Sequence, residues 1–221
     1  MKYESSGVTI EGDTQLETFA REYNLSGDGT PENPIVISGF RFTFPFSANS
    51  GLIFKHTTLH VVITQCIFEC KSPDTIVGAQ SHYAYLFSHV YMYNCQNITI
   101  KDNIFICNNW FVVGVVIEIC DNIIIMNNLF DGQNVAQCGV HGDGSGTLLI
   151  CNNITYGFQY ALDILMTRRV VIAHNIAINC NVFVREFGLR QFESAYHSAW
   201  RLIKNISHYA ENSRYIVKCI F

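Results

Sequence analysis

Residues 123–132 read IIIMNNLFDG, and four other segments of the chain align with this one without gaps. The counterparts are VVITQCIFEC (61–70), ITIKDNIFIC (98–107), LLICNNITYG (148–157) and VVIAHNIAIN (170–179). Internal repeats with periods of about 20–50 residues are typical of proteins built from stacked structural units. The repeat is therefore the main evidence for the fold.

The repeated segment has the pattern of a strand, a bend and a second strand. Aliphatic residues at its first and third positions lie on the same face of a strand, since side chains alternate along it. Asparagine, which tolerates the left-handed conformation of sharp turns, occupies the sixth position in four segments. Stacked asparagine amides can also bond from coil to coil, so we expect a ladder at this turn. The sixth-position residues are Cys66, Asn103, Asn128, Asn153 and Asn175.

Small residues form a further column, three positions before the first aliphatic residue of each unit, and suit a tight turn between flat faces. They are Thr58, Cys95, Cys120, Ser145 and Thr167.

The spacing of the sixth-position residues predicts an all-β, single-stranded solenoid. The steps between positions 66, 103, 128, 153 and 175 are 37, 25, 25 and 22 residues, and the last three fit one coil of a parallel β-helix each. The longer first step predicts an insertion within 71–96, where Pro73 and Gly78 indicate a loop. Helical periodicity is absent between the predicted strands, which argues against an ordinary α/β fold.

This I-x-I-x-x-N-x-F register resembles the right-handed parallel β-helix superfamily, which includes pectate lyases, polygalacturonases and phage tailspikes. The segment GDGTPENPIVISGF (27–40) is similar to the first turn of many such domains, and the resemblance covers roughly residues 24–187. It implies a right-handed coil, but it does not select a function, because the superfamily includes lyases, hydrolases, epimerases and binding proteins. Small cysteine-rich β-helices of this kind also resemble proteins of large DNA viruses.

We divide the chain into three parts: an N-terminal segment with a capping helix (1–23), the β-helix (24–187), and a C-terminal capping helix and strand (188–221). Short helical caps are expected because open coils expose unpaired strand edges. Residues 13–23 fit an amphipathic helix with Leu16, Phe19 and Ala20 on one face.

Either Asp13 or Thr14 is expected to cap the N-terminal helix. Residues 191–206 follow helical spacing, and a last strand is expected at 215–221. The C-terminal helix would close the solenoid or, alternatively, join copies of the chain into a homo-oligomer.

Composition excludes several classes of protein. Hydrophobic residues make up 49% of the 221 and charged residues 14%, so the chain must fold around a large core. The net charge of −4, without a basic cluster, argues against nucleic-acid binding. No secretory signal and no membrane-spanning apolar run is found, so we expect a cytoplasmic or virion protein whose nine cysteines are reduced.

No metal site or cofactor is expected. His56, His60, Cys66 and Cys70 have metal-ligand spacing, but Cys66 occupies the inward column and cannot easily join His60 on one zinc ion.

Acidic residues supply the candidates for catalysis. Glu118 and Asp143 both stand five positions before the first aliphatic column, and Asp163 stands seven before it. Stacked coils lie about 4.8 Å apart, so these acids could form the carboxylate pair of a glycosidase. With His141 or Arg168 assisting, they could instead perform lyase chemistry, for which Ca²⁺ is a possible cofactor. The alternative is a solvated acidic face without catalysis.

Aromatic residues supply the candidates for ligand binding. Tyr83 and Tyr85 fall in the predicted insertion, and Trp110 follows one coil later. Exposed rings along a groove would stack on sugar faces, whereas rings that fold onto the flank would be buried instead.

Three functions remain. The preferred one is a non-catalytic β-helix that binds a glycan or protein partner along its flank. The second is a polysaccharide lyase or glycoside hydrolase with an acidic groove. The third is a structural component, such as a virion protein that assembles through its C-terminal helix.

Overall fold

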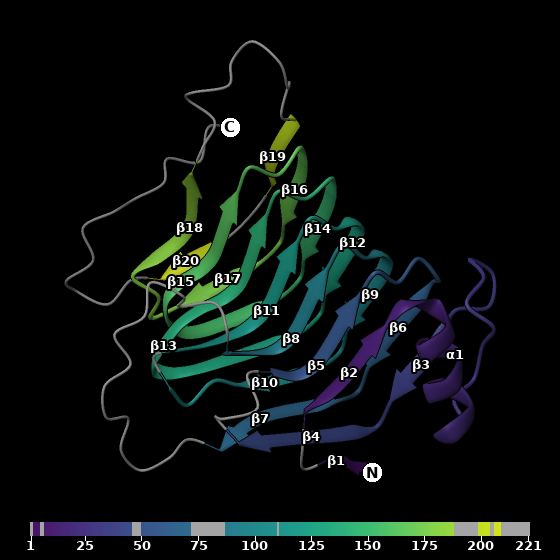
Figure 1. The fold of residues 1–221 in the computed structure, drawn as a ribbon. Coiled ribbons are helices and arrows are strands. Elements are labelled where there is room, and N and C mark those ends of the chain that lie inside the picture. The colour runs from purple at the N-terminus through teal and green to yellow at the C-terminus, as the bar shows by residue number, and fades with distance from the viewer. Residues whose placement is uncertain are drawn as a thin grey trace.

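The computed structural model describes residues 2–4, 7–45, 50–71, 87–109, 111–187, 199–203 and 206–208. Over these ranges the chain forms a parallel β-solenoid with one short helix, which confirms the all-β prediction. Strands that are neighbours in space come from successive coils, as Figure 1 shows. No helix in the described ranges has the length and apolarity required to cross a membrane.

One face of the solenoid is a seven-stranded sheet with the spatial order β19-β16-β14-β12-β9-β6-β3. It contains the first and third positions of every repeated segment, and its ladders pair Ile98 with Ile123 and Ile123 with Leu148. The sequence alignment is therefore also the strand register. The strands are β3 (Ile35–Ser38), β6 (Val61–Thr64), β9 (Gln96–Lys101), β12 (Asp121–Met126), β14 (Thr147–Cys151), β16 (Arg169–Ala173) and β19 (Ala199–Ile203).

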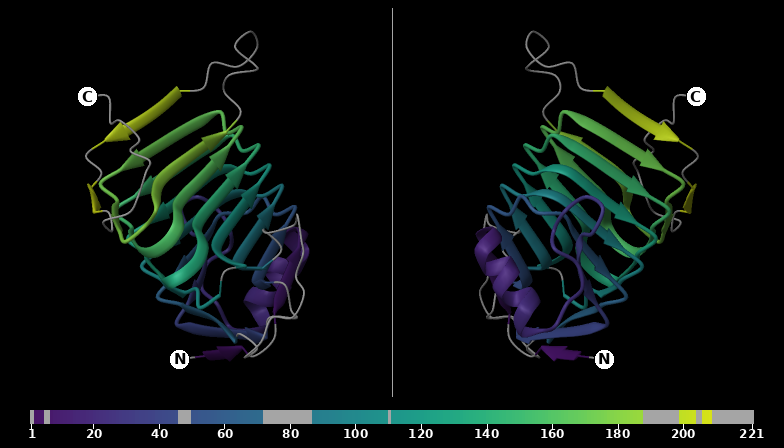
Figure 2. Two further views of the ribbon diagram at one scale, coloured as in Figure 1. Left: turned by 90° about the vertical axis from the view of Figure 1, so that its left-hand side faces the viewer. Right: turned by 90° about the vertical axis from the view of Figure 1, so that its right-hand side faces the viewer.

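A thirteen-stranded sheet forms the other two faces. Its second face contains β1 (Lys2–Glu4), β4 (Phe40–Pro45), β7 (Ile67–Lys71), β10 (Ile104–Ile106), β17 (Ile176–Ile178) and β20 (Ile206–His208). Its third face contains β2 (Val8–Glu11), β5 (Ser50–Lys55), β8 (Phe87–Tyr93), β11 (Val112–Glu118) and β18 (Val182–Phe187). The long strands β13 (Leu129–Asp143) and β15 (Ile154–Leu165) bend from the second face to the third, since β13 pairs first with β10 and then with β11. Figure 2 shows the resulting stack from two sides.

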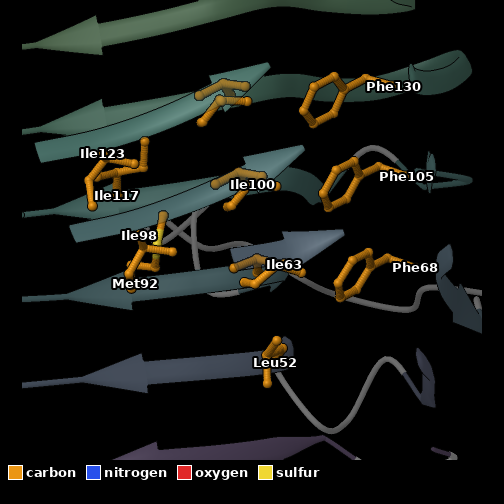
Figure 3. Close-up of a cluster of buried hydrophobic side chains, with 14 of the residues drawn as sticks. Leu52, Ile63, Phe68, Met92, Ile98, Ile100, Phe105, Ile117, Ile123 and Phe130 are labelled. Atoms are coloured by element: carbon orange, nitrogen blue, oxygen red, sulfur yellow. The ribbon is translucent and has the colours of Figure 1, made fainter. Parts of the chain in front are cut away.

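Columns of identical or similar side chains fill the interior. The rings of Phe42, Phe68, Phe105 and Phe130 stack almost parallel, with centroids 4.9, 4.9 and 4.6 Å apart. Figure 3 shows three of these rings beside the aliphatic columns. Because inward residues repeat in register, each coil buries the apolar surface of the next.

Asparagines fill the inner side of the corner between the first and second faces. Asn128 Oδ1 accepts hydrogen bonds from the backbone N–H of Asn103, at 3.0 Å, and from Asn103 Nδ2, at 3.1 Å. Asn128 Nδ2 in turn donates to the Ile100 carbonyl and to Asn153 Oδ1, and Asn153 is bonded to Asn175 in the same way. All four asparagines are buried. Their amides therefore form hydrogen bonds with backbone groups that water cannot reach.

We had expected the asparagine itself to adopt the left-handed conformation at this corner. The left-handed residue is instead the one that precedes the asparagine. Exposed polar side chains occupy the position, because they can bond locally and tolerate positive φ. The residues are Gln65, Asp102, Asn127, Asn152 and His174, with φ between 53° and 57°.

The N-terminal helix α1 (Gly12–Glu22) buries Leu16, Phe19 and Ala20, as the apolar spacing predicted. It lies at the N-terminal end of the solenoid (Figures 1 and 2). The predicted cap was wrong: Glu11 is the N-cap residue and has no side-chain capping bond. Asp13 instead accepts hydrogen bonds from the backbone N–H and hydroxyl of Thr58, at 2.7 and 2.6 Å. Strands β1 and β2, which precede the helix, were not predicted.

At the C-terminal end the predicted helix over 191–206 is wrong wherever the structure describes it. Ala199–Ile203 is strand β19, which pairs with β16, and Ile206–His208 is strand β20, which pairs with β17. The chain adds another coil here because Trp200 and Leu202 align with Val170 and Ile172. The predicted strand at 215–221 lies outside the described residues. Of the range 71–96 in which an insertion was predicted, residues 72–86 also lie outside them, whereas Phe87–Tyr93 is the regular strand β8.

Replacing Asn128 with alanine should destabilise the protein strongly. The change removes the acceptor of two Asn103 donors and the donor to the Ile100 carbonyl, all of them buried. Each buried polar group left without a partner costs about 1–3 kcal/mol, so we expect the free energy of unfolding to fall by roughly 3–5 kcal/mol in urea titrations. Asn127→Asp is the matched control, because Asp102 stands at the same exposed turn position one coil earlier. Equal stability of the two variants would contradict the argument.

A fully buried histidine lies in the core beside the phenylalanine stack. The His89 ring contacts Phe44 edge-on, with centroids 5.5 Å apart, and its Nδ1 lies 3.3 Å from Cys107 Sγ. Burial lowers the pKa of His89 from 6.5 to about 3, although a hydrogen bond with the Ile106 backbone opposes the shift. The imidazole is therefore neutral in the folded protein at neutral pH.

This histidine should make the fold sensitive to acid. Below pH 6.5 the unfolded chain binds a proton that folded His89 does not accept until about pH 3. The free energy of unfolding therefore decreases as the pH is lowered from 6.5 toward 3. The slope is about 1.4 kcal/mol per pH unit, or roughly 2–3 kcal/mol between pH 6.5 and 4.5. His89→Phe should lose this part of the pH dependence in urea titrations at the two pH values. His174→Asn, at an exposed turn, should keep it; an unchanged slope in His89→Phe would disprove the assignment.

Candidate functional site

The outer side of the third face carries a second buried cluster. Val112, Val115 and Ile117 of β11 belong to the main core, whereas Val113 and Val116 belong to a separate cluster with Cys138. Since Val116 lies between the inward Val115 and Ile117 and side chains alternate there, this second cluster lies on the opposite side of the sheet. Tyr91 and Tyr160 pack against it.

Three charged or titratable residues lie in one row of this face. The ladders place His141 of β13 opposite Asp163 of β15, and Asp163 opposite Arg185 of β18. His141 Nδ1 is 3.1 Å from Asp163 Oδ2, and Arg185 Nε donates to Asp163 Oδ1 at 2.7 Å, with a second bond from its Nη2 to Oδ2. His141 and Asp163 are buried, and the Arg185 side chain is 25% exposed and lies over the Tyr160 ring.

Two opposing effects act on the Asp163 carboxyl. Burial raises its pKa, but the hydrogen bonds and charges of Arg185 and His141 together outweigh burial and lower the pKa to about 2. Asp163 is therefore ionised at neutral pH and can only accept hydrogen bonds, so His141 carries a proton on Nδ1. This leaves a histidine held by a carboxylate, an arrangement that general bases also use.

The other two predicted acids form a second pair on the same face. Glu118 of β11 and Asp143 of β13 are register partners, as their equal offset from the aliphatic column suggested. The Tyr91 hydroxyl donates to Glu118 Oε2 at 2.6 Å, and burial together with this bond raises the pKa of Tyr91. Asp143 Oδ1 is buried and has no hydrogen-bond partner within the described ranges.

The structure thus groups the five predicted catalytic residues into two neighbouring pairs and one separate residue. Glu118 stands beside Asp143, and His141 beside Asp163, while Arg168 is exposed next to β16 on the first face. The arginine that binds Asp163 is Arg185, which sequence reasoning missed. The sequence did contain a signal for Arg185, because 22 residues separate His141 from Asp163 and Asp163 from Arg185. The same step separates Asn153 from Asn175.

The predicted ligand-binding residues Tyr83, Tyr85 and Trp110 lie outside the described residues. A different feature, not foreseen from the sequence, lies where β13 and β15 bend from the second face to the third. There the structure has a cavity of about 310 Å³. Its lining residues are Asn134, Val135, Ala136, Gly157, Phe158, Gln159, Asn179 and Asn181.

Backbone geometry at this bend aims the polar groups outward. Asn134 and Gly157 have φ of 61° and 72°, and the ladder between β13 and β15 shifts register between Asp131 and Ala136. A bulge of this kind redirects side chains at the edge of a coil. Asn181 Nδ2 donates to Gln159 Oε1 at 2.6 Å, which orients both amides. We call this feature the amide pocket.

Metal binding finds no support in the described part of the chain, where no three His, Cys, Asp or Glu side chains come together around a possible ion. The eight cysteines of these ranges are free thiols. No family model, curated protein or solved structure matches the chain.

Replacing Asp163 with asparagine should destabilise the third face. The change leaves Arg185 and buried His141 without their carboxylate, and such a loss costs about 3–5 kcal/mol when both partners are buried. Since Arg185 is partly exposed, we expect a loss of roughly 3 kcal/mol in the free energy of unfolding, measured by urea titration.

Asp102→Asn is the control, because Asn127 and Asn152 occupy the equivalent turn position in later coils. If both aspartate variants had the same urea midpoint as the wild type, the row of His141, Asp163 and Arg185 would contribute nothing to stability.

Proposed function

We propose that this protein is a non-catalytic parallel β-helix that binds a neutral glycan on its flank, in the amide pocket. The observation that carries the proposal is a cavity whose lining, among the residues that the structure describes, has four side-chain amides and no charged group. An amide both donates and accepts hydrogen bonds, which matches a sugar hydroxyl. The absence of charge from this described part of the lining favours a neutral sugar over a uronate or a phosphate.

Apolar groups complete the chemistry of the pocket. Val135 is 44% exposed in the lining, whereas Phe158 belongs to the buried main core. The exposed valine can cover a C–H face of a sugar ring while the amides bind its hydroxyls. The volume of about 310 Å³ is at the lower end of the usual range of about 300–1,000 Å³ for small-ligand sites, and it suits a mono- or disaccharide unit.

Successive coils contribute equivalent parts of the pocket. The lining comes from the bends of β13 and β15 and from the segment after β17, which follow one another along the solenoid axis. A ligand of repeated units could therefore extend along the flank. Tyr83, Tyr85 and Trp110 remain proposed contacts for such a ligand.

The enzymatic alternative rests on the β-helix superfamily and on the acids of the third face. This alternative assumes a right-handed coil, which is expected for parallel crossovers. It also assumes that the chain is related to pectate lyases. Against it, Asp163 is fully buried and already bonded to His141 and Arg185. A lyase would also place its acids, with Ca²⁺, in an open groove. Glycan binding without turnover therefore fits the geometry better.

An assembly role has one supporting observation of its own. The residues that follow the asparagine row form an aliphatic column on the outer side of the second face, and three of them are 39–40% exposed: Ile104, Leu129 and Ile154. Contiguous exposed apolar residues mark interaction surfaces. This column could join the protein to a second copy or to a virion.

Neutral oligosaccharides should bind the protein, and Gln159→Ala and Asn181→Ala should weaken that binding. Losing one amide partner of a hydroxyl costs about 1–1.5 kcal/mol, so each variant should raise Kd roughly tenfold in calorimetric titrations of hits from a glycan panel. Gln96→Ala, an exposed glutamine on β9, is the matched control and should bind as the wild type does.

Failure of all neutral glycans to bind would reject the proposal. Release of shorter products from a bound glycan would instead favour the enzymatic alternative. A concentration-dependent rise in mass by light scattering, without glycan binding, would favour assembly.

A further inference from the structure

Small residues line the inner side of the corner between the third and first faces. The sequence alignment placed Thr58 in this column, but the buried residue is Thr57, because the Gln96 N–H bonds the Thr57 carbonyl just as the Asp121 N–H bonds that of Cys95. The column is Thr57, Cys95, Cys120, Ser145 and Thr167, all at most 1% exposed. Two of its adjacent members are thiols.

The two thiols are stacked directly, one coil above the other. The ladders pair Tyr93 with Glu118 and Gln96 with Asp121 on either side of them, so Cys95 faces Cys120. Parallel strands lie about 4.8 Å apart, within the Cα separation of about 4.4–6.8 Å that disulfides require. The Cys95 N–H donates to Cys120 Sγ at 3.4 Å, so the Cys120 sulfur points toward its neighbour.

The pKa values of the two buried thiols shift in opposite directions. A hydrogen bond from Cys120 lowers the pKa of Cys95 to about 6, with help from Thr57 and against the effect of burial. The same bond, together with burial, raises the pKa of Cys120. One of the two sulfurs can therefore act as nucleophile at neutral pH while the other keeps its proton.

A second stacked pair provides an internal comparison. Cys70 and Cys107 follow the register partners Glu69 and Ile106, and both are fully buried. Burial raises the pKa of Cys70 to about 12 and that of Cys107 well above its usual range. These two pairs have the same coil spacing, but the pKa of Cys95 is lowered whereas that of Cys70 is raised.

We propose that Cys95 and Cys120 form a reversible disulfide between adjacent coils when the protein meets a peroxide. The Cys95 thiolate attacks one oxygen of hydrogen peroxide, which forms a sulfenic acid and releases hydroxide. The Cys120 thiol then displaces the sulfenic oxygen, which leaves as water, and the S–S bond forms. The peroxide is thereby reduced, the two thiols are oxidised, and both side chains rotate toward each other.

The test is limited oxidation of the folded protein, followed by alkylation, digestion and mass spectrometry. We expect a peptide pair linked through Cys95 and Cys120 that lacks two hydrogen atoms and separates on reduction with dithiothreitol. Loss of free Cys95 should be roughly tenfold faster, or more, than loss of Cys70. In Cys120→Ser the sulfenic acid should persist at Cys95 and react with dimedone.

Serine is tolerated at this position, because Ser145 occupies it one coil later and its hydroxyl bonds the Cys120 N–H. Cys107→Ser is the matched control and should leave the Cys95–Cys120 link intact. Two results would overturn the proposal: free Cys95 and Cys120 after other cysteines have oxidised, or a Cys70–Cys107 link that forms at the same rate. A persistent Cys95–Cys120 link in the absence of oxidant would also contradict a reversible, peroxide-dependent step.

Discussion

The structure depends on successive coils lying in register, so that each residue stands over its counterpart in the next coil. Backbone hydrogen bonds between parallel strands hold this register along the flat faces. At the corner between the first and second faces, buried asparagine amides add bonds to the backbone and to one another, from Asn103, Asn128, Asn153 and Asn175. A slip of one residue would turn inward side chains outward, so the apolar columns and the amides specify the same register.

Much of the fold was predictable because the constraint repeats. The aligned segments identified the strands of the first face and their partners, and the equal offset of Glu118 and Asp143 identified them as neighbours. The C-terminal coil was misassigned because Leu202 fits a helical series with Ala199 as well as a strand series with Trp200. Asn205 and Ile206 follow Leu202 at the same offsets as Asn175 and Ile176 follow Ile172, and this match was the overlooked signal.

The candidate sites were less predictable, because each depends on a local departure from the repeat. The amide pocket requires the left-handed residues Asn134 and Gly157 in the middle of long strands, and periodicity does not reveal such bends. Arg185 follows the repeat, but charged residues on outer faces are less constrained than the core columns, so its signal was limited to the step of 22 residues from Asp163. The choice between Thr57 and Thr58 needed the hydrogen bonds themselves, because the turn before β6 has one extra residue.

The middle of the stack has two consecutive coils of identical length, since 25 residues separate Asn103 from Asn128 and Asn128 from Asn153. In solenoids each unit contacts little beyond its immediate neighbours, and stability is approximately a sum over these contacts. If one such unit were removed or duplicated, all the remaining residues would therefore still lie above the equivalent residue of the neighbouring coil. The molecule can thus vary in length by whole coils while its cross-section stays constant, a route by which descendants could gain or lose flank area without building a new core.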